Sequence, residues 1–217
     1  RNARFTTLVS FMDFAKRPPN HDDPPCGDRS VRRADSKLWD HCDLRHYAGS
    51  TIAHPMPIQT PFTSPSEVVR PEWIDYNGHM NIGYYLVAFD NAAETFFHSV
   101  GLTPEFRKRN HSTTFALESH LNYLREVKQG DMLRFESRLL EFDSKRLHFY
   151  MEMFHASEGF LVASFESMSS HVDTRTRKTA PFPDEILPLL ARIKAAHAVL
   201  PRPWQVGHVI GTKPGPR

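Results

Sequence analysis

The chain has 217 residues, of which 40% are hydrophobic and 24% are charged, an ordinary composition for a globular protein. Its formal net charge of +2 does not indicate a nucleic-acid partner. No run of residues approaches the ~18 apolar positions of a membrane span, so we expect no membrane segment. The only cysteines, Cys26 and Cys42, suggest no disulfide framework. A reducing compartment, and therefore a cytoplasmic location, is the default expectation.

The chain divides into three zones. Residues 1–63 are rich in Pro, Asp, Arg and His without sustained periodicity, which predicts a disordered leader, with a transit peptide as an alternative. Residues 64–200 carry the patterns of a folded domain. Residues 201–217 return to Pro, Gly and basic residues, which predicts a flexible tail. The leader also contains four potential zinc ligands, Cys26, His41, Cys42 and His46. Because their spacing matches no standard pair of ligand knuckles, we predict no metal site.

The folded zone opens with a short strand and a long helix. Val68 and Val69 indicate a first strand that ends near Trp73, and polar turn residues follow. From Asn81 to Val100, apolar residues recur at spacings of three and four, the pattern of an amphipathic helix. Asn81 suits the N-cap or the first turn, and Gly101 is a natural stop.

After this helix the apolar period changes from about 3.6 to two, which predicts strands. Four alternating runs lie at 115–123, 133–139, 147–153 and 161–165, the last of which could continue to Val172. Turn residues lie in the three breaks between these runs, at 129–131, 143–145 and 157–159. The spacing fits an antiparallel meander. A last helix is expected from near Asp184 or Pro188 to Ala198, with Pro188 in its first turn.

This order of elements predicts an α+β domain. A helix of about 20 residues spans roughly 30 Å and carries one apolar face. A curved antiparallel sheet of five or six strands is the only large partner available to bury that face. The periodicity alone does not select the topology.

The segment Trp73–Asn81 carries a resemblance to a known family. Its pattern is Asp75, two residues, Gly78, His79, an apolar residue and Asn81, followed by a helix with aromatic residues in its first turns. The segment resembles the 4-hydroxybenzoyl-CoA thioesterase-like family of hot-dog folds. Its residue sequence is most similar to that of the betainyl-CoA thioesterases. Asp75, Asn77 and His79 also match the Asp-x-Asn-x-His form of plant-type acyl-carrier-protein thioesterases. The resemblance implies a hot-dog fold, with the sheet wrapped around one long central helix, and places the catalytic carboxylate at Asp75.

Thioester hydrolysis needs a nucleophile or a base that activates water, together with donors that stabilise the carbonyl oxyanion. Asp75 can serve as either. Gly78 lets the backbone approach a ligand closely. We expect the oxyanion to meet the free amides that begin the helix, at Met80, Asn81 and Ile82, where the helix dipole is positive.

Other residues in or near this segment are candidates for a role in the site. Asn77 or His79 could orient Asp75 or a water molecule. A cationic acyl group would need aromatic or anionic neighbours, and the candidates are Trp73, Tyr76, Tyr84 and Tyr85, although these suit aryl or fatty acyl groups as well. A basic rim for the phosphates of coenzyme A could come from Arg125, Lys128 and Arg134, for which surface solvation is an equal alternative.

The sequence leaves several less specific interpretations open. The Asp-Tyr-Asn-Gly run could be only a turn with a helix cap. Asp90 and Glu94 lie on the flank of the helix, where some hot-dog thioesterases carry their carboxylate, although a solvated flank is favoured. Glu118 and His120 lie on the non-core face of a strand and could approach the site.

The expected function is hydrolysis of an acyl-CoA thioester without a cofactor. The resemblance also implies a homodimer or a tetramer of dimers, with no nucleic-acid or membrane partner. Two alternatives are a hot-dog hydratase or dehydratase, whose longer Asp-to-His-Pro-His arrangement is not found here, and a non-catalytic acyl-binding module. Hydrolysis that depends on Asp75 would separate these. The acyl group is not fixed by the sequence.

Overall fold

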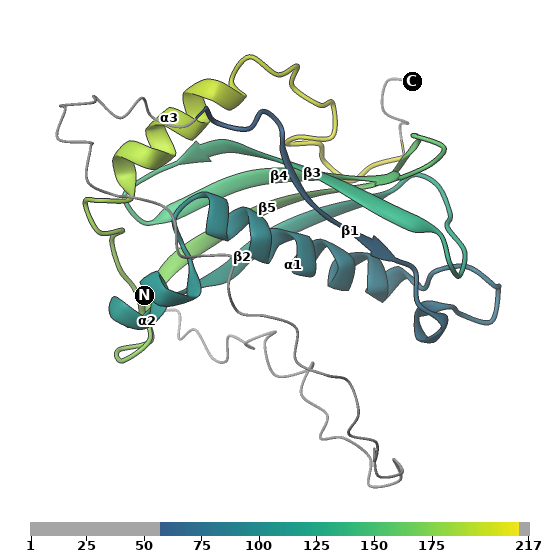
Figure 1. The fold of residues 1–217 in the computed structure, drawn as a ribbon, viewed down its shortest axis with the longest axis horizontal. Coiled ribbons are helices and arrows are strands. Elements are labelled where there is room, and N and C mark those ends of the chain that lie inside the picture. Colours follow the sequence, from purple (N-terminus) through teal and green to yellow (C-terminus); the bar gives the residue numbers. More distant parts are fainter. Residues whose placement is uncertain (1–56, 213–217) are drawn as a thin grey trace, which may run out of the picture. The chain divides into compact units, whose positions relative to one another are not determined.

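The computed structural model describes residues 57–212, which contain a single antiparallel sheet and its helices (Figure 1). The strands are β1 (Phe62–Val68), β2 (Ser112–Tyr123), β3 (Met132–Phe142), β4 (Arg146–His155), β5 (Leu161–Asp173) and β6 (Lys178–Thr179). The helices are a 3-10 turn (Pro71–Trp73), α1 (Ile82–Ser99), α2 (Pro104–Arg109) and α3 (Leu187–His197). The sheet has six strands in the order β1-β3-β4-β5-β2, with β6 paired to β5. This confirms the predicted α+β hot-dog fold.

Helix α1 runs along the sheet and buries its apolar face against the strands (Figure 1). Asn81 is the N-cap, and its side chain accepts a hydrogen bond of 3.0 Å from the Gly83 N–H. Phe89 stacks on Phe165 of β5, with ring centroids 5.3 Å apart. Phe96 packs on Phe149 of β4 at 5.5 Å. The predicted helix and the core role of its phenylalanines are confirmed, and each buried ring contributes about 2–3 kcal/mol of hydrophobic stabilisation.

Helix α1 ends as predicted, at a glycine. Gly101 has a φ of +90°, a left-handed conformation that side chains other than glycine adopt only at a cost. A Cβ on Gly101 would also lie 3.0 Å from the Ile186 side chain and 3.2 Å from that of Leu189. The sequence analysis did not predict α2, which follows directly and is capped by the Thr103 hydroxyl accepting from the Phe106 N–H.

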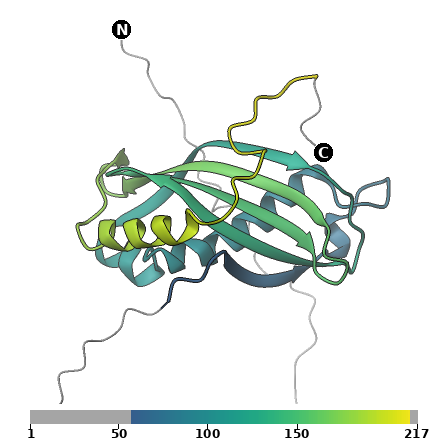
Figure 2. The same cartoon turned by 90° about the horizontal axis from the view of Figure 1, so that it is seen from above.

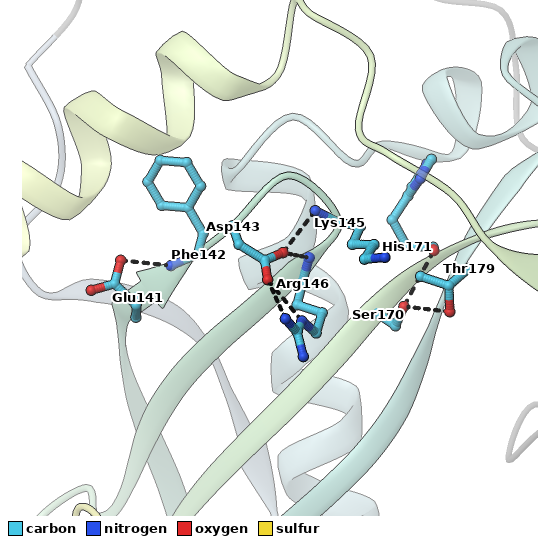
Figure 3. A network of polar contacts seen from close by, with 8 residues as sticks. All are labelled: Glu141, Phe142, Asp143, Lys145, Arg146, Ser170, His171 and Thr179. Atoms are coloured by element: carbon cyan, nitrogen blue, oxygen red, sulfur yellow. Dashed lines mark hydrogen bonds and ion pairs between the residues drawn. The ribbon is translucent and has the colours of Figure 1, made fainter. Parts of the chain in front are cut away.

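The predicted turn between β3 and β4 is confirmed, and Figure 3 shows the polar contacts that hold it. Asp143 Oδ1 accepts hydrogen bonds of 2.8 Å from the N–H groups of Lys145 and Arg146. Its other oxygen accepts from the Arg146 side chain, also at 2.8 Å. The short connection fixes the register of the hairpin, which places the alternate apolar residues of β3 and β4 on the face that covers α1.

Helix α3 lies at the same end of the sheet as α2 (Figure 2). Leu190 and Ile193 are buried in the main core, and Pro188 sits in the first turn, as predicted. His197, in the last turn of α3, accepts a hydrogen bond at Nδ1 from the Leu139 N–H (2.9 Å). Its other ring nitrogen lies 3.0 Å from the Gln59 carbonyl oxygen. This histidine therefore joins α3, β3 and the segment before β1.

The first strand differs from its prediction. A first strand that contains Val68 is confirmed, but its predicted extension to near Trp73 is wrong, because β1 ends at Val68 and Pro71–Trp73 form a 3-10 turn. The predicted domain boundary at Ser64 falls inside β1, which begins at Phe62. The four cysteine and histidine residues considered as zinc ligands lie outside the described residues.

Part of the predicted flexible tail packs on the domain. Gln205 and Val206 are 4% and 8% exposed. The Gly207 N–H donates a 2.7 Å hydrogen bond to the Glu166 carboxylate on β5. Residues 205–207 of the predicted tail are thus held on the sheet, whereas Val209 and Ile210 are 81% and 86% exposed. Within residues 57–212, no helix combines the length and hydropathy needed to cross a membrane.

Candidate active site

A three-residue hairpin loop presents Asp75 just before α1. The Asp75 N–H donates to the His79 carbonyl (2.9 Å), and the Gly78 N–H donates to the Asp75 carbonyl (3.0 Å). An isolated bridge pairs Ile74 with Met80 on either side. Gly78 has a φ of +79°, the left-handed position that such a loop requires. Gly78 therefore has a backbone role in this loop, and a Cβ there would meet nothing within 4 Å.

One oxygen of the Asp75 carboxylate is hydrogen-bonded within the turn, and the other is available to a substrate or a water molecule. Its Oδ1 accepts a 2.8 Å hydrogen bond from the Asn77 N–H, which makes the run a side-chain-capped turn, as the less specific interpretation proposed. Among the described residues, no group donates to Oδ2. The Asp75 residue is half-buried, whereas Asn77 is exposed. The turn orients one oxygen and leaves the other able to meet a substrate or a water molecule.

Two of the three amides predicted to be free at the start of α1 are occupied. The Met80 N–H donates to the Val127 carbonyl at 2.9 Å. The Asn81 N–H donates to the Trp73 carbonyl at 2.8 Å. These bonds fasten the loop to neighbouring segments, so the two amides are not available to an oxyanion. Among the described residues, the Ile82 N–H has no acceptor, and the Ile82 residue is 63% exposed.

His79 pairs with a residue that the sequence analysis did not single out. Its Nε2 lies 3.2 Å from the Glu126 carboxylate, and no contact joins it to the Asp75 side chain. The suggestion that His79 orients Asp75 is therefore not supported by a direct hydrogen bond. Glu126 follows β2 and is about 50 residues from the loop in sequence, so no local pattern connects the two.

Trp73 and Tyr84 form one aromatic pair beside the loop. Their rings stack 5.7 Å apart at 15°, and Trp73 is buried. Tyr84 thus lies next to the site, as predicted, on the first turn of α1. Tyr76 is 97% exposed at the tip of the loop and contacts no aromatic ring among the described residues.

Tyr85 and Tyr123 form a second pair, edge to face at 5.2 Å. The Tyr123 hydroxyl donates to the Ile82 carbonyl (3.3 Å) at the start of α1. Burial raises the pKa of the Tyr85 phenol, and the nearby carboxylates of Glu126 and Asp75 raise it further. Both carboxylates therefore act on the same tyrosine, which stays neutral at physiological pH. Tyr123 ends β2 and was predicted only as a strand residue.

The two helix carboxylates considered as alternatives have other surroundings. Glu94 accepts from Arg107 at 2.7 Å and lies 3.1 Å from His98, so it belongs to an ion-pair cluster near α2. Asp90 lies on the flank of α1, where desolvation raises the pKa of its carboxyl and the charge of Glu94 raises it further. No contact joins Asp90 or Glu94 to Asp75.

The remaining candidates are dispersed. The Arg125 guanidinium lies 4.9 Å from the centroid of the Phe160 ring. Arg134 forms an ion pair with Glu136 on the sheet, away from the loop. Glu118 is exposed, and the His120 ring stacks on His208 of the C-terminal segment. Of the predicted basic rim, Arg125 and Lys128 directly flank Glu126 and Val127, which contact the loop.

The comparisons with known proteins agree with this fold. A family model described as the thioesterase-like superfamily matches residues 69–190. A betainyl-CoA thioesterase of Pseudomonas aeruginosa is 38% identical over 146 residues, which cover 67% of this chain and 92% of that protein. An L-carnitine dehydrogenase/betainyl-CoA thioesterase of Rhizobium meliloti is 34% identical over 145 residues, which span 67% of this chain but only 29% of the longer protein.

Solved structures show the same arrangement. A hypothetical protein of Staphylococcus aureus in complex with CoA aligns with a TM-score of 0.66 and 29% identity. The alignment covers 74% of this chain and 100% of the other. A putative thioesterase of Pseudomonas putida aligns with a TM-score of 0.62 and 29% identity, covering 72% and 99%. The chain belongs to the thioesterase-like superfamily. It is a thioester hydrolase.

Proposed function

We propose that the protein hydrolyses an acyl-CoA thioester with Asp75 as the catalytic carboxylate. The observation that carries the proposal is the position of Asp75. Its Oδ1 is held by the Asn77 N–H, while Oδ2 has no donor among the described residues, at the entry to α1. A carboxylate oriented in this way needs no further reorganisation to approach a carbonyl carbon.

Two routes are open to this carboxylate. In the first, an Asp75 oxygen attacks the thioester carbonyl, the C–S bond breaks, coenzyme A leaves as a thiolate, and water then hydrolyses the mixed anhydride. In the second, Asp75 accepts a proton from a water molecule that attacks the carbonyl directly, and the thiolate leaves from the tetrahedral intermediate. Both yield a free acid and coenzyme A without a cofactor.

The Ile82 amide is the donor that supports oxyanion stabilisation best. It begins α1, where the helix dipole is positive, and it has no acceptor within the described part of the chain. Loss of one such donor typically costs ~10²–10³ in kcat. Met80 and Asn81 act differently, because their amides hold the loop against Val127 and Trp73.

The names of the relatives support a betainyl group as the acyl portion of one substrate. This group is short and carries a quaternary ammonium, which aromatic rings and carboxylates bind. Both kinds of side chain lie near the loop that carries Asp75: Glu126 contacts His79, and Tyr85, on which the Asp75 charge acts, packs on Tyr123. The CoA complex of the Staphylococcus aureus structure supports CoA as the carrier of the thioester.

Substitution of the carboxylate tests the proposal. Asp75→Asn keeps the shape and the turn but removes the charge, so kcat with betainyl-CoA should fall by ~10²–10⁴. Asp90→Asn, a carboxylate on α1 without a contact to the loop, is the matched control and should retain turnover. His79→Ala should cost less than Asp75→Asn. Near-normal turnover in Asp75→Asn together with loss of activity in Asp90→Asn would move the catalytic carboxylate to the helix.

A single turnover in H₂¹⁸O can establish the nucleophilic route. If Asp75 is the nucleophile and water attacks the mixed anhydride at the aspartyl carbon, ¹⁸O enters the Asp75 side chain, which mass spectrometry of the peptide that contains Asp75 detects. General-base catalysis, and attack of water at the acyl carbon of the anhydride, both put the label only in the released acid. Trapping of the acyl-enzyme with hydroxylamine then separates these two, because only the nucleophilic route forms a covalent intermediate.

We further propose that two copies associate through β2, giving a homodimer that could pair again into a tetramer. β2 is an edge strand of the sheet. Leu117 and Tyr123 on this strand are 50% and 47% exposed, which is unusual for an unprotected edge. Light scattering should therefore give twice the chain mass. Leu117→Lys should shift the population toward monomers, whereas a monomeric wild type would contradict the assembly.

A further inference from the structure

The entrance to α1 holds a small corner of aromatic and acidic side chains. Tyr123 offers a half-exposed ring that meets Tyr85 edge to face at 5.2 Å. Glu126 reaches the same loop through its 3.2 Å contact with His79. The Asp75 N–H is bonded to the His79 carbonyl at 2.9 Å, so the catalytic loop and Glu126 meet at one residue. Tyr85 links these groups, because its ring packs on Tyr123 and its phenol lies close enough to Glu126 and Asp75 for both carboxylates to act on it.

The chemistry of a betainyl thioester restricts where its cation can lie. Only one methylene separates the quaternary nitrogen from the carbonyl carbon. If Asp75 attacks that carbon or activates the water that does, the trimethylammonium group must lie in the immediate surroundings of Asp75. The groups that recognise the cation must therefore come from this corner, and not from a distant pocket.

We propose that Glu126 and Tyr123 are the residues that select a cationic acyl group over a neutral one of the same shape. This inference rests on the proposed function. The Glu126 carboxylate supplies a charge opposite to that of the ammonium, and the Tyr123 ring offers its face to the methyl groups. The His79 Nε2 lies 3.2 Å from the Glu126 carboxylate, a contact that orients this carboxylate beside the loop.

The two residues have distinct supports. The Tyr123 hydroxyl is anchored to the Ile82 carbonyl at 3.3 Å, which fixes the ring next to the start of α1. The Glu126 side chain is 67% exposed in a single chain and therefore open to a ligand. Asp75 adds a second negative charge but is committed to the reaction. Glu126 is the carboxylate that is free to act on specificity.

The test compares two substrates that differ only in charge. Betainyl-CoA and 3,3-dimethylbutyryl-CoA have the same branched shape, with nitrogen replaced by carbon in the second. The measured quantity is the ratio of their kcat/KM values in the wild type and in the Glu126→Gln, Tyr123→Leu and Tyr123→Phe variants. Glu118→Gln, which changes an exposed carboxylate on β2, is the matched control.

The wild type should prefer betainyl-CoA. Glu126→Gln keeps an acceptor for His79 but loses the charge, so the ratio should fall by at least about 5-fold. Tyr123→Leu should lower it by about 2-fold to 30-fold, and Tyr123→Phe should retain most of it, because the ring face remains. Glu118→Gln should leave the ratio unchanged. Equal losses for both substrates in Glu126→Gln, or no preference in the wild type, would overturn the inference.

The experiment also separates this inference from the proposed function. If turnover of both substrates depends on Asp75 but the ratio of kcat/KM values is unchanged in Glu126→Gln, only the proposed selection of the cation is wrong. If Asp75→Asn retains full turnover of both substrates, the catalytic assignment itself fails. Melting curves of every variant show whether a lost rate reflects a lost fold, and Tyr123→Phe retains the ring packing if Tyr123→Leu does not fold.

Discussion

His197 is a buried residue that links separate segments of the fold, and its replacement should lower the free energy of unfolding. The residue is 4% exposed. Its Nδ1 accepts from the Leu139 N–H at 2.9 Å, so the neutral ring carries its proton on Nε2 and donates it to the Gln59 carbonyl at 3.0 Å. His197→Phe fills the volume but leaves the buried Leu139 N–H without a partner, while the carbonyl of the exposed Gln59 can bond water instead. At about 1–3 kcal/mol for a buried unsatisfied group, the loss is about 1–3 kcal/mol.

The same contacts give a pH dependence with a defined sign. Burial lowers the pKa of His197, with the charge of Arg138 contributing, against the raising effect of the Gln59 hydrogen bond. In the unfolded chain the His197 imidazole binds a proton near pH 6.5. In the folded chain it does not bind that proton at the same pH, since protonation of Nδ1 would break the hydrogen bond from the Leu139 N–H. This contribution to stability is therefore constant above about pH 7.5. It falls as pH drops through 6.5, by up to about 1.4 kcal/mol per pH unit.

Urea unfolding measured between pH 5 and 8 tests both statements. His197→Phe should lose about 1–3 kcal/mol at pH 8, equivalent to roughly 2–12 °C in Tm, and should show a shallower fall toward acid than the wild type. His111→Asn is the matched control, because it removes an exposed histidine from a left-handed position that asparagine accepts. A loss below 1 kcal/mol, or parallel pH curves for wild type and His197→Phe, would refute the reasoning.

Three further outcomes are expected. Gly101→Ala should cost about 2 kcal/mol in urea unfolding, because φ is +90° and the new Cβ would press on Ile186 and Leu189. Asn81→Ala should cost about 1 kcal/mol by the same measurement, since the Gly83 N–H loses its cap. Deletion from Pro201 onward should lower Tm by several degrees, roughly the effect of exposing one or two buried side chains, because Val206 is 8% exposed.

Long periodic elements were predictable because their signal is repeated many times. Helix α1 repeats its apolar spacing over 18 residues, and the strands β3, β4 and β5 alternate over ten or more. β1 has no such repeat: its seven residues include a proline, and its register shifts between Ser64 and Glu67. α2 is only six residues long, although Thr103 and Pro104 are typical of a helix start.

The parts of the site that lie within one segment were also predictable, whereas the contacts between segments were not. The order Asp75, Gly78, Asn81 specifies a turn followed by a cap, and the structure contains both. The acceptor of the Met80 amide is a carbonyl at residue 127, on a connection that local patterning does not place. The same is true of the pairing of His79 with Glu126. Non-local partners decided which amides are free and which carboxylate meets the histidine.

The exposure of the loop has a consequence for catalysis. Tyr76 is 97% exposed and Ile82 is 63% exposed, so in a single chain water reaches both the carboxylate and the remaining helix amide. An oxyanion donor is effective only where water is excluded, because the surrounding dielectric then stays low. The exposed end of β2, at Tyr123, lies beside this entrance through its bond to the Ile82 carbonyl. Pairing of two β2 strands would bring a second chain to the same place, so a variant that separates the copies should lose turnover even though Asp75 is intact.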